Sequence, residues 1–229
     1  MVAPMKVLGG IGMLTGRADL PAGWAVEAVG SVHRSDFRQS DADFVEPKAG
    51  LRLEWNHSGR WAVAATAFER KRRYDSREEY TAFGRALTGT RLCFRQREAE
   101  ISAKYAWTAH GKWTAKLGAG LLTSRDGASG FFDYDQRRGQ GEITWEATPW
   151  TLAVEGSASR YRYLVQTVGI GLDPPPRRRD ENVAKFRMSR TVAKGWIVFG
   201  EYRWERSDTN EDNEDYRVLT AGAGLRREF

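Results

Sequence analysis

The chain has 229 residues and a hydrophobic content of 41%, which suits one domain and excludes wholesale disorder. Its 36 Lys and Arg are interspersed with 30 Asp and Glu, so the formal net charge of +6 gives no clear indication of a nucleic-acid partner, and we expect none. No run approaches the roughly 18 consecutive apolar residues that a membrane helix needs, which excludes a helical membrane protein. The mean hydropathy of −0.60 suggests a soluble protein, but the pattern along the chain contradicts that suggestion.

The single cysteine, Cys93, excludes an internal disulfide and a CxxC metal site. We expect no metal and no cofactor. The first residues lack the charged and then apolar profile of a signal peptide, so the chain is either a mature form or a fragment of something longer.

Alternation of apolar and polar residues predicts strands along the whole chain. Between residues 99 and 109, for example, Ala, Ile, Ala, Tyr and Trp at odd positions alternate with Glu100, Ser102 and Lys104. A period of two indicates strands with one apolar face, so the predicted class is all-β and antiparallel. In chain order, the predicted strands cover residues 6–15, 24–34, 47–55, 61–74, 87–109, 113–123, 138–147, 150–163, 181–192, 196–206 and 216–229.

Short turns and long polar loops alternate between these strands. Eight of the nine tryptophans lie beside five short turns that contain Gly or Pro, which supply the turn dihedrals. The long loops cover residues 35–46, 75–85, 124–136, 166–180 and 207–215. This difference between the two ends of the strands is typical of outer-membrane barrels.

Two environments are compatible with strands that have one apolar face. In a soluble sandwich or lipocalin-like barrel, that face packs inward. The predicted strands of about 9–13 residues, however, match a tilted membrane strand of about 9–11 and exceed the soluble average of about 5–6. Trp196 and Trp204 also stand eight residues apart on one face, close to the height of an outer-membrane apolar band. We therefore predict a transmembrane β-barrel whose interfacial aromatic girdle consists of Trp24, Trp55, Trp61, Trp107, Trp113, Trp145, Trp150, Trp196 and Trp204.

The C-terminal segment carries a resemblance to a known group. Residues 216–229 form an amphipathic strand that ends on Phe229, and this is similar to the last strand of bacterial outer-membrane β-barrel proteins. Residues 179–217 resemble the final hairpins of a porin-like barrel group, some of whose members are fused to tetratricopeptide repeats or linked to exopolysaccharide or surface-protein secretion. The resemblance implies a Gram-negative outer-membrane location and Phe229 as part of the signal for the barrel-assembly machinery. It further implies contact with outer-membrane lipid and lipopolysaccharide, and a periplasmic secretion partner.

The predicted strand count is odd, whereas bacterial single-chain barrels have an even number of strands. Residues 87–109 could hide a turn at Arg97 and Glu98, but splitting them would move the earlier Trp-flanked turns to the other side of the membrane. We favour an intact barrel of about 12 strands. On this hypothesis, residues 1–229 form a single barrel domain that lacks its first strand or an N-terminal periplasmic domain.

The polar faces of the strands predict a charged lumen. Its predicted lining is Arg52, Glu54, Glu100, Lys104, Lys116, Glu142, Glu146, Glu155, Lys185, Arg187, Glu201, Arg203 and Glu205. Two interpretations remain open. The charges line a porin-like or secretion-associated channel for a small or extended polar solute, or they form a salt-bridge lattice in a plugged, structural barrel that serves as a membrane anchor or assembly platform.

Basic runs at residues 70–73, 137–138 and 177–179 lie in or beside the long loops, where they would face lipopolysaccharide phosphates or remain as solvated charge.

An outer-membrane hydrolase is a third and weaker hypothesis. It rests on His33, which has Ser31, Ser35 and Asp36 close in sequence. His57 and His110 lie in the short turns, where barrel enzymes do not place their sites. We therefore expect no enzyme and no catalytic residue.

Overall fold

A computed structural model describes residues 7–37, 43–169, 172–211 and 214–227. Eleven strands form one antiparallel sheet in the order β1-β2-β3-β4-β7-β8-β9-β10-β11-β12-β13, so each strand pairs with the strands next to it along the chain. The strands are β1 (Val7–Asp19), β2 (Trp24–Phe37), β3 (Phe44–His57), β4 (Trp61–Tyr74), β7 (Cys93–Thr108), β8 (Lys112–Asp126), β9 (Tyr134–Ala147), β10 (Trp150–Thr167), β11 (Pro176–Ala193), β12 (Trp196–Thr209) and β13 (Tyr216–Arg227). A separate hairpin, β5 (Glu79–Tyr80) with β6 (Ala86–Leu87), lies in the connection between β4 and β7.

The predicted all-β antiparallel class and the eleven strands are confirmed. Strand β7 runs through Arg97 and Glu98 without a break, since Arg97 lies opposite Glu69 on one side and Thr123 on the other. The possible turn at these two residues is therefore wrong. The small β5–β6 hairpin falls within residues for which we predicted a loop and the start of a strand.

Several strands are longer at their long-loop ends than predicted. Strand β9 begins at Tyr134, and β11 begins at Pro176. The run at 177–179, which was predicted inside the loop 166–180, therefore lies on β11, and Arg137 joins Arg138 on β9. In these segments both faces are polar, so no apolar alternation marks them as strands. Backbone pairing with the neighbouring strands holds them in the sheet instead.

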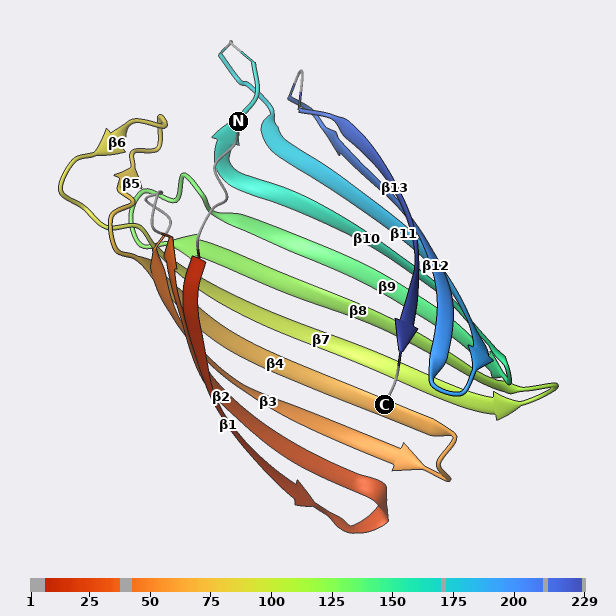
Figure 1. Ribbon diagram of the computed structural model, residues 1–229. Coiled ribbons are helices and arrows are strands. Elements are labelled where there is room, and N and C mark those ends of the chain that lie inside the picture. Colours follow the sequence, from red (N-terminus) through yellow and green to blue (C-terminus); the bar gives the residue numbers. More distant parts are fainter. Residues whose placement is uncertain (1–6, 38–42, 170–171, 212–213, 228–229) are drawn as a thin grey trace.

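The sheet is rolled, and β1 and β13 form its two free edges (Figure 1). Within the described ranges, β1 pairs only with β2, and β13 pairs only with β12. The sheet is therefore curved like the wall of a barrel, but in the described residues no strand pairing joins β1 to β13.

Alternation along the strands creates two chemically different faces. One cavity of ≈ 620 Å³ is lined by Arg52 of β3 and Arg203 of β12, although six strands separate β3 from β12 in the sheet. Side chains so far apart along the sheet can share a cavity only on its concave side. The concave face is therefore the charged one. The convex face exposes apolar side chains such as Leu51, Ile101 and Leu117.

No helix among the described residues is long and apolar enough to cross a membrane. The helical content there is one short 3₁₀ turn, Pro21–Gly23, between β1 and β2.

Two turn glycines provide a matched test of the short-turn end. Gly111 has φ +132°, and a Cβ there would lie 2.6 Å from Trp145 Nε1 and 2.8 Å from the Glu146 carbonyl oxygen. Gly59 has φ +66°, and a Cβ there would meet nothing within 4 Å. We expect Gly59→Ala to cost about 1–2 kcal/mol through backbone strain alone. Gly111→Ala should cost clearly more, because it also displaces the Trp145 ring and the β9 backbone.

The measurement is the urea midpoint of folded protein in detergent, followed by heat-modifiable migration. Equal midpoints for the two variants would show that the contacts around Gly111 do not matter for folding.

Candidate functional site

The concave face carries a wall of charged side chains. Strand register places all thirteen predicted lumen residues on this face, and seven of them line the 620 Å³ cavity. Those seven are Arg52, Glu100, Lys116, Glu142, Glu155, Lys185 and Arg203. One row of directly opposite residues crosses six strands and consists of Lys104, Lys116, Glu142, Glu155, Lys185 and Arg203.

Ion pairs join most of these charges across the strands. Arg187 bridges two carboxylates, since it bonds Glu155 on β10 and lies 3.3 Å from Glu201 on β12. Lys185 Nζ also lies 3.3 Å from Glu201, and Lys116 Nζ lies 2.8 Å from Glu142. The pairs Arg52–Glu54 and Arg203–Glu205 run along single strands.

These ion pairs remain open to solvent, and the Arg187 side chain is 48% exposed. Exposed pairs contribute only about 0–1 kcal/mol each, so their stabilising effect is small. Their main effect is on the electrostatic field and the free width of the cavity. Within the described part of the chain, Lys104 has no carboxylate within ion-pair distance and remains an uncompensated cation of the wall.

The wall has further charged members at its long-loop end that were not predicted. Arg138 lies 2.6 Å from Glu100 and 3.5 Å from Glu98, and it joins β9 to β7 across β8. Arg179 lies 2.5 Å from Glu181, which accepts a 2.9 Å hydrogen bond from the Tyr161 hydroxyl. The signal that could have found these residues was present. Glu98 and Arg138 lie at even spacing from Glu100 and Glu142 within predicted strands, and Arg179 continues the same alternation from Lys185 beyond the predicted strand start at residue 181.

A cluster of apolar side chains, the loop cluster, lies on the concave side of the sheet at the long-loop end, since the register sets Phe44 opposite Tyr74 and Phe94 opposite Arg72. Its buried members are Phe44, Tyr74 and Leu92, and Phe94 and Phe132 pack against them. Leu92 is 1% exposed, and its backbone N–H donates to the Arg77 carbonyl oxygen at 2.7 Å. Tyr80 of the β5–β6 hairpin contacts Phe132 with ring centroids 5.2 Å apart. The connection between β4 and β7 is thereby fixed onto the connection between β8 and β9.

Two aspartates organise the second of these loops. Asp126 accepts backbone hydrogen bonds from Ala128, Gly130 and Phe132 at 3.0, 2.8 and 3.0 Å. Asp133 accepts a 2.6 Å hydrogen bond from the Asp126 backbone N–H. Burial raises the pKa of the Asp133 carboxyl, and that hydrogen bond opposes the rise. These hydrogen bonds fix the conformation of the loop and thereby hold Phe132 in position.

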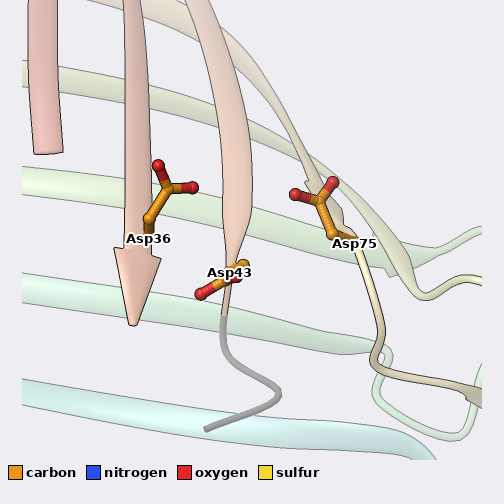
Figure 2. A group of neighbouring side chains, drawn as sticks. All are labelled: Asp36, Asp43 and Asp75. Carbon is orange, nitrogen blue, oxygen red and sulfur yellow. The ribbon is translucent and has the colours of Figure 1, made fainter. Parts of the chain in front are cut away.

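Three carboxylates meet where β2 and β4 end and β3 begins. Asp36, Asp43 and Asp75 bring oxygens within 4.8 Å of one another (Figure 2). Such oxygens are ligands for a hard cation such as Ca²⁺. Arg34, however, already supplies positive charge to the cluster, since its guanidinium lies 3.0 Å from Asp36 and 3.5 Å from Asp75.

His33 contacts Ser35, which lies two residues away on the same face of β2. Its Nε2 lies 3.0 Å from the buried Ser35 Oγ. Asp36 lies on the opposite face of β2 by alternation, so it does not complete a triad. Glu46, which lies opposite His33 in the register, binds Arg72 at 2.6 Å. Among the described residues, neither Asp36 nor Glu46 is thus shown to hydrogen-bond the His33 ring.

Aromatic rings form a belt at the short-turn end. Trp113 lies between Trp107 and Trp145, with centroid separations of 5.7 and 6.1 Å. Trp24 and Trp55 are 6.2 Å apart on the neighbouring strands β2 and β3. Of the predicted girdle, Trp61, Trp150 and Trp196 also flank short turns, whereas Trp204 lies within β12. Phe229, the predicted assembly signal, lies outside the described residues.

No protein-family model matches the chain, and no curated protein matches it. Among solved structures, the chain is similar to the siderophore receptor PiuA from Acinetobacter baumannii, with a TM-score of 0.50 and 8% sequence identity. The match covers 96% of this chain and 45% of the receptor chain, so this chain spans less than half of the receptor's length. At this identity the similarity concerns the fold, and with the rolled antiparallel sheet it supports a β-barrel architecture.

Proposed function

We propose that the protein is an outer-membrane β-barrel that acts as a porin-like or secretion-associated channel for a small or extended polar solute. The observation that carries this proposal is the charged cavity on the concave face of a sheet whose convex face is apolar. A soluble barrel has the opposite arrangement, with its apolar residues inside.

The wall suits passive passage of a hydrated solute. Charges of both signs occur at the same level, as Lys116 and Glu142 do, so the wall offers both a cation and a carboxylate to a passing solute. Solvent reaches the paired side chains, which leaves hydrogen-bonding groups available along the wall. The proposed mechanism involves no covalent chemistry, and the paired charges set the width and the selectivity of the path.

A plugged or structural barrel, serving as a membrane anchor or assembly platform, is the second candidate. The observation that favours it is the loop cluster around Leu92, which lies on the concave side of the sheet. The extensive pairing of the wall charges also fits a lattice that braces the barrel.

The free edges of β1 and β13 need strand partners in a membrane, because hydrocarbon cannot satisfy their backbone hydrogen-bonding groups. A barrel of about 12 strands supplies one further strand between them. In keeping with this location, we also propose the barrel-assembly machinery, outer-membrane lipid and a periplasmic secretion component as partners.

Two measurements test the proposal in order. The first is whether the purified protein requires detergent and shows heat-modifiable migration. A detergent-free monomer with a stable β signal would contradict the membrane location itself. The second is conductance in a planar bilayer, where the channel predicts a steady open level. Detergent-dependent protein that inserts without a steady level would favour the structural barrel.

A further inference from the structure

The basic run at residues 70–73 is divided between the two faces of β4. Arg70 and Arg72 lie on the concave side, where Glu46 is 4.0 Å from Arg70 and 2.6 Å from Arg72. Lys71 and Arg73 alternate with them and lie on the convex side. Over the ranges that the structure describes, no carboxylate lies within ion-pair distance of Lys71 or Arg73. The run is therefore neutralised on the inside and left charged on the outside.

A pocket on the convex side collects these free cations. Its volume is ≈ 660 Å³, and Lys71, Arg73 and Arg91 line it. All three side chains are exposed, and Arg91 likewise has no carboxylate partner among the described residues. Asp75 also lines the pocket, and its carboxylate lies 3.5 Å from the guanidinium of Arg34. The pocket thus carries a surplus of positive charge. The rest of its lining is mainly apolar and consists of Val45, Pro47, Tyr74, Leu92 and Cys93.

An apolar groove follows on the same face of the same strands. Its volume is ≈ 1260 Å³, and small residues such as Gly16, Gly30 and Ala67 line it. Along β4 the convex face changes from Arg73 and Lys71 to Glu69, which Arg95 and Arg97 contact at 2.7 and 3.1 Å, and then to apolar residues. The apolar stretch of this face consists of Ala67, Ala65, Val63 and Trp61. The cationic pocket and the apolar groove therefore follow one another along the same face, with the Glu69 ion pairs between them and at the end of the groove.

From this continuity we propose that the pocket and the groove together bind a phosphorylated, acylated lipid. Lys71, Arg73 and Arg91 bind its phosphate, and the groove takes its acyl chains. Guanidinium groups suit phosphate because they donate two parallel hydrogen bonds. A soluble phosphate leaves the groove empty, and an uncharged lipid leaves three cations without a counter-ion. The proposal rests on the membrane location proposed above and would place this end of the strands at the lipid headgroups.

The experiment measures binding of bis-phosphorylated lipid A to detergent-purified protein by native mass spectrometry. The charge variant carries Lys71→Gln, Arg73→Gln and Arg91→Gln. We expect it to bind about 100-fold more weakly, since each cation near a phosphate layer contributes roughly fivefold. Its matched control carries Arg60→Gln, Lys112→Gln and Lys194→Gln, which remove three exposed cations from the short-turn end. We expect the control to bind like the parent protein.

A groove variant separates acyl recognition from phosphate recognition. A Cβ at Gly16 or Gly30 would meet nothing within 4 Å, so Gly16→Leu with Gly30→Leu fills the groove without a backbone clash. It should weaken binding of lipid A and leave binding of the deacylated, phosphorylated disaccharide unchanged.

Unchanged lipid A affinity in the charge variant would overturn the proposal. So would equal affinity for dephosphorylated lipid A. If inorganic phosphate or the deacylated disaccharide bound as tightly as lipid A, the ligand would be a soluble phosphate and not a lipid. Detergent dependence is measured separately, so failure of the membrane location and failure of lipid binding are distinguishable.

Discussion

Leu92→Ala is expected to destabilise the loop cluster by about 2–5 kcal/mol, which is the usual cost of truncating a buried leucine. Leu92 is 1% exposed and lies among the rings of Phe44 and Tyr74, which cannot close over a cavity without moving their strands. The β4–β7 connection should then open far more often. In the bilayer, the expected result is a larger or more frequent open level, because the cluster lies on the concave side of the sheet.

Limited proteolysis of residues 75–92 measures this opening. A loss of 2 kcal/mol corresponds to about 30-fold faster cleavage when opening and closing are fast. Leu172→Ala is the control, since that side chain is fully exposed, and it should leave cleavage unchanged. Equal cleavage of the Leu92 variant and the parent protein would show that the cluster does not hold this loop.

Arg187→Gln is expected to shift the ion selectivity of the proposed channel toward cations. The change leaves Glu155 and Glu201 without the guanidinium that bridges them. One unit charge about 8 Å away in water is worth about 0.5 kcal/mol, or roughly a twofold change in local counter-ion concentration. Stability should fall by less than about 1 kcal/mol, because all three side chains remain partly exposed.

The reversal potential in a salt gradient measures the selectivity. Arg190→Gln is the matched control, because it removes the same charge from the same strand on the opposite face. Arg190 lies over the Trp150 ring at 5.0 Å. If both variants shifted the potential equally, the concave face would not be the ion path.

The strands could be predicted where one face is apolar. Residues 61–74 match β4 at both ends, because Trp61, Val63 and Ala65 alternate with smaller or polar neighbours throughout its first half. The start of β11 was missed because residues 177–180 are charged on both faces. In such segments the neighbouring strands determine the conformation, and a single stretch of sequence carries no sign of them.

The candidate site could likewise be predicted only in part from the sequence. The alternation of residues along each strand was enough to place Lys116 and Glu155 on one face. It contained no information on the register between neighbouring strands. Which charges pair depends on the stagger of neighbouring strands, and Arg138 reaches Glu100 across an entire intervening strand. The loop cluster could not be predicted either, since it joins residues as far apart as Phe44 and Phe132.

The one-sided placement of the indole rings has a consequence for how the protein would rest in a bilayer. At the short-turn end, stacked rings such as Trp107 and Trp113 would set the depth of the protein in the bilayer, because they partition into the membrane interface. Salt has little effect on that partitioning. At the long-loop end, cations such as Arg73 and Arg91 would set the depth through the proposed lipid contact, and salt would screen that attraction. The position of the short-turn end would therefore depend on aromatic partitioning, and that of the long-loop end on electrostatic attraction. On the proposed membrane location, a change in membrane thickness or in counter-ions would therefore shift the long-loop end more than the short-turn end.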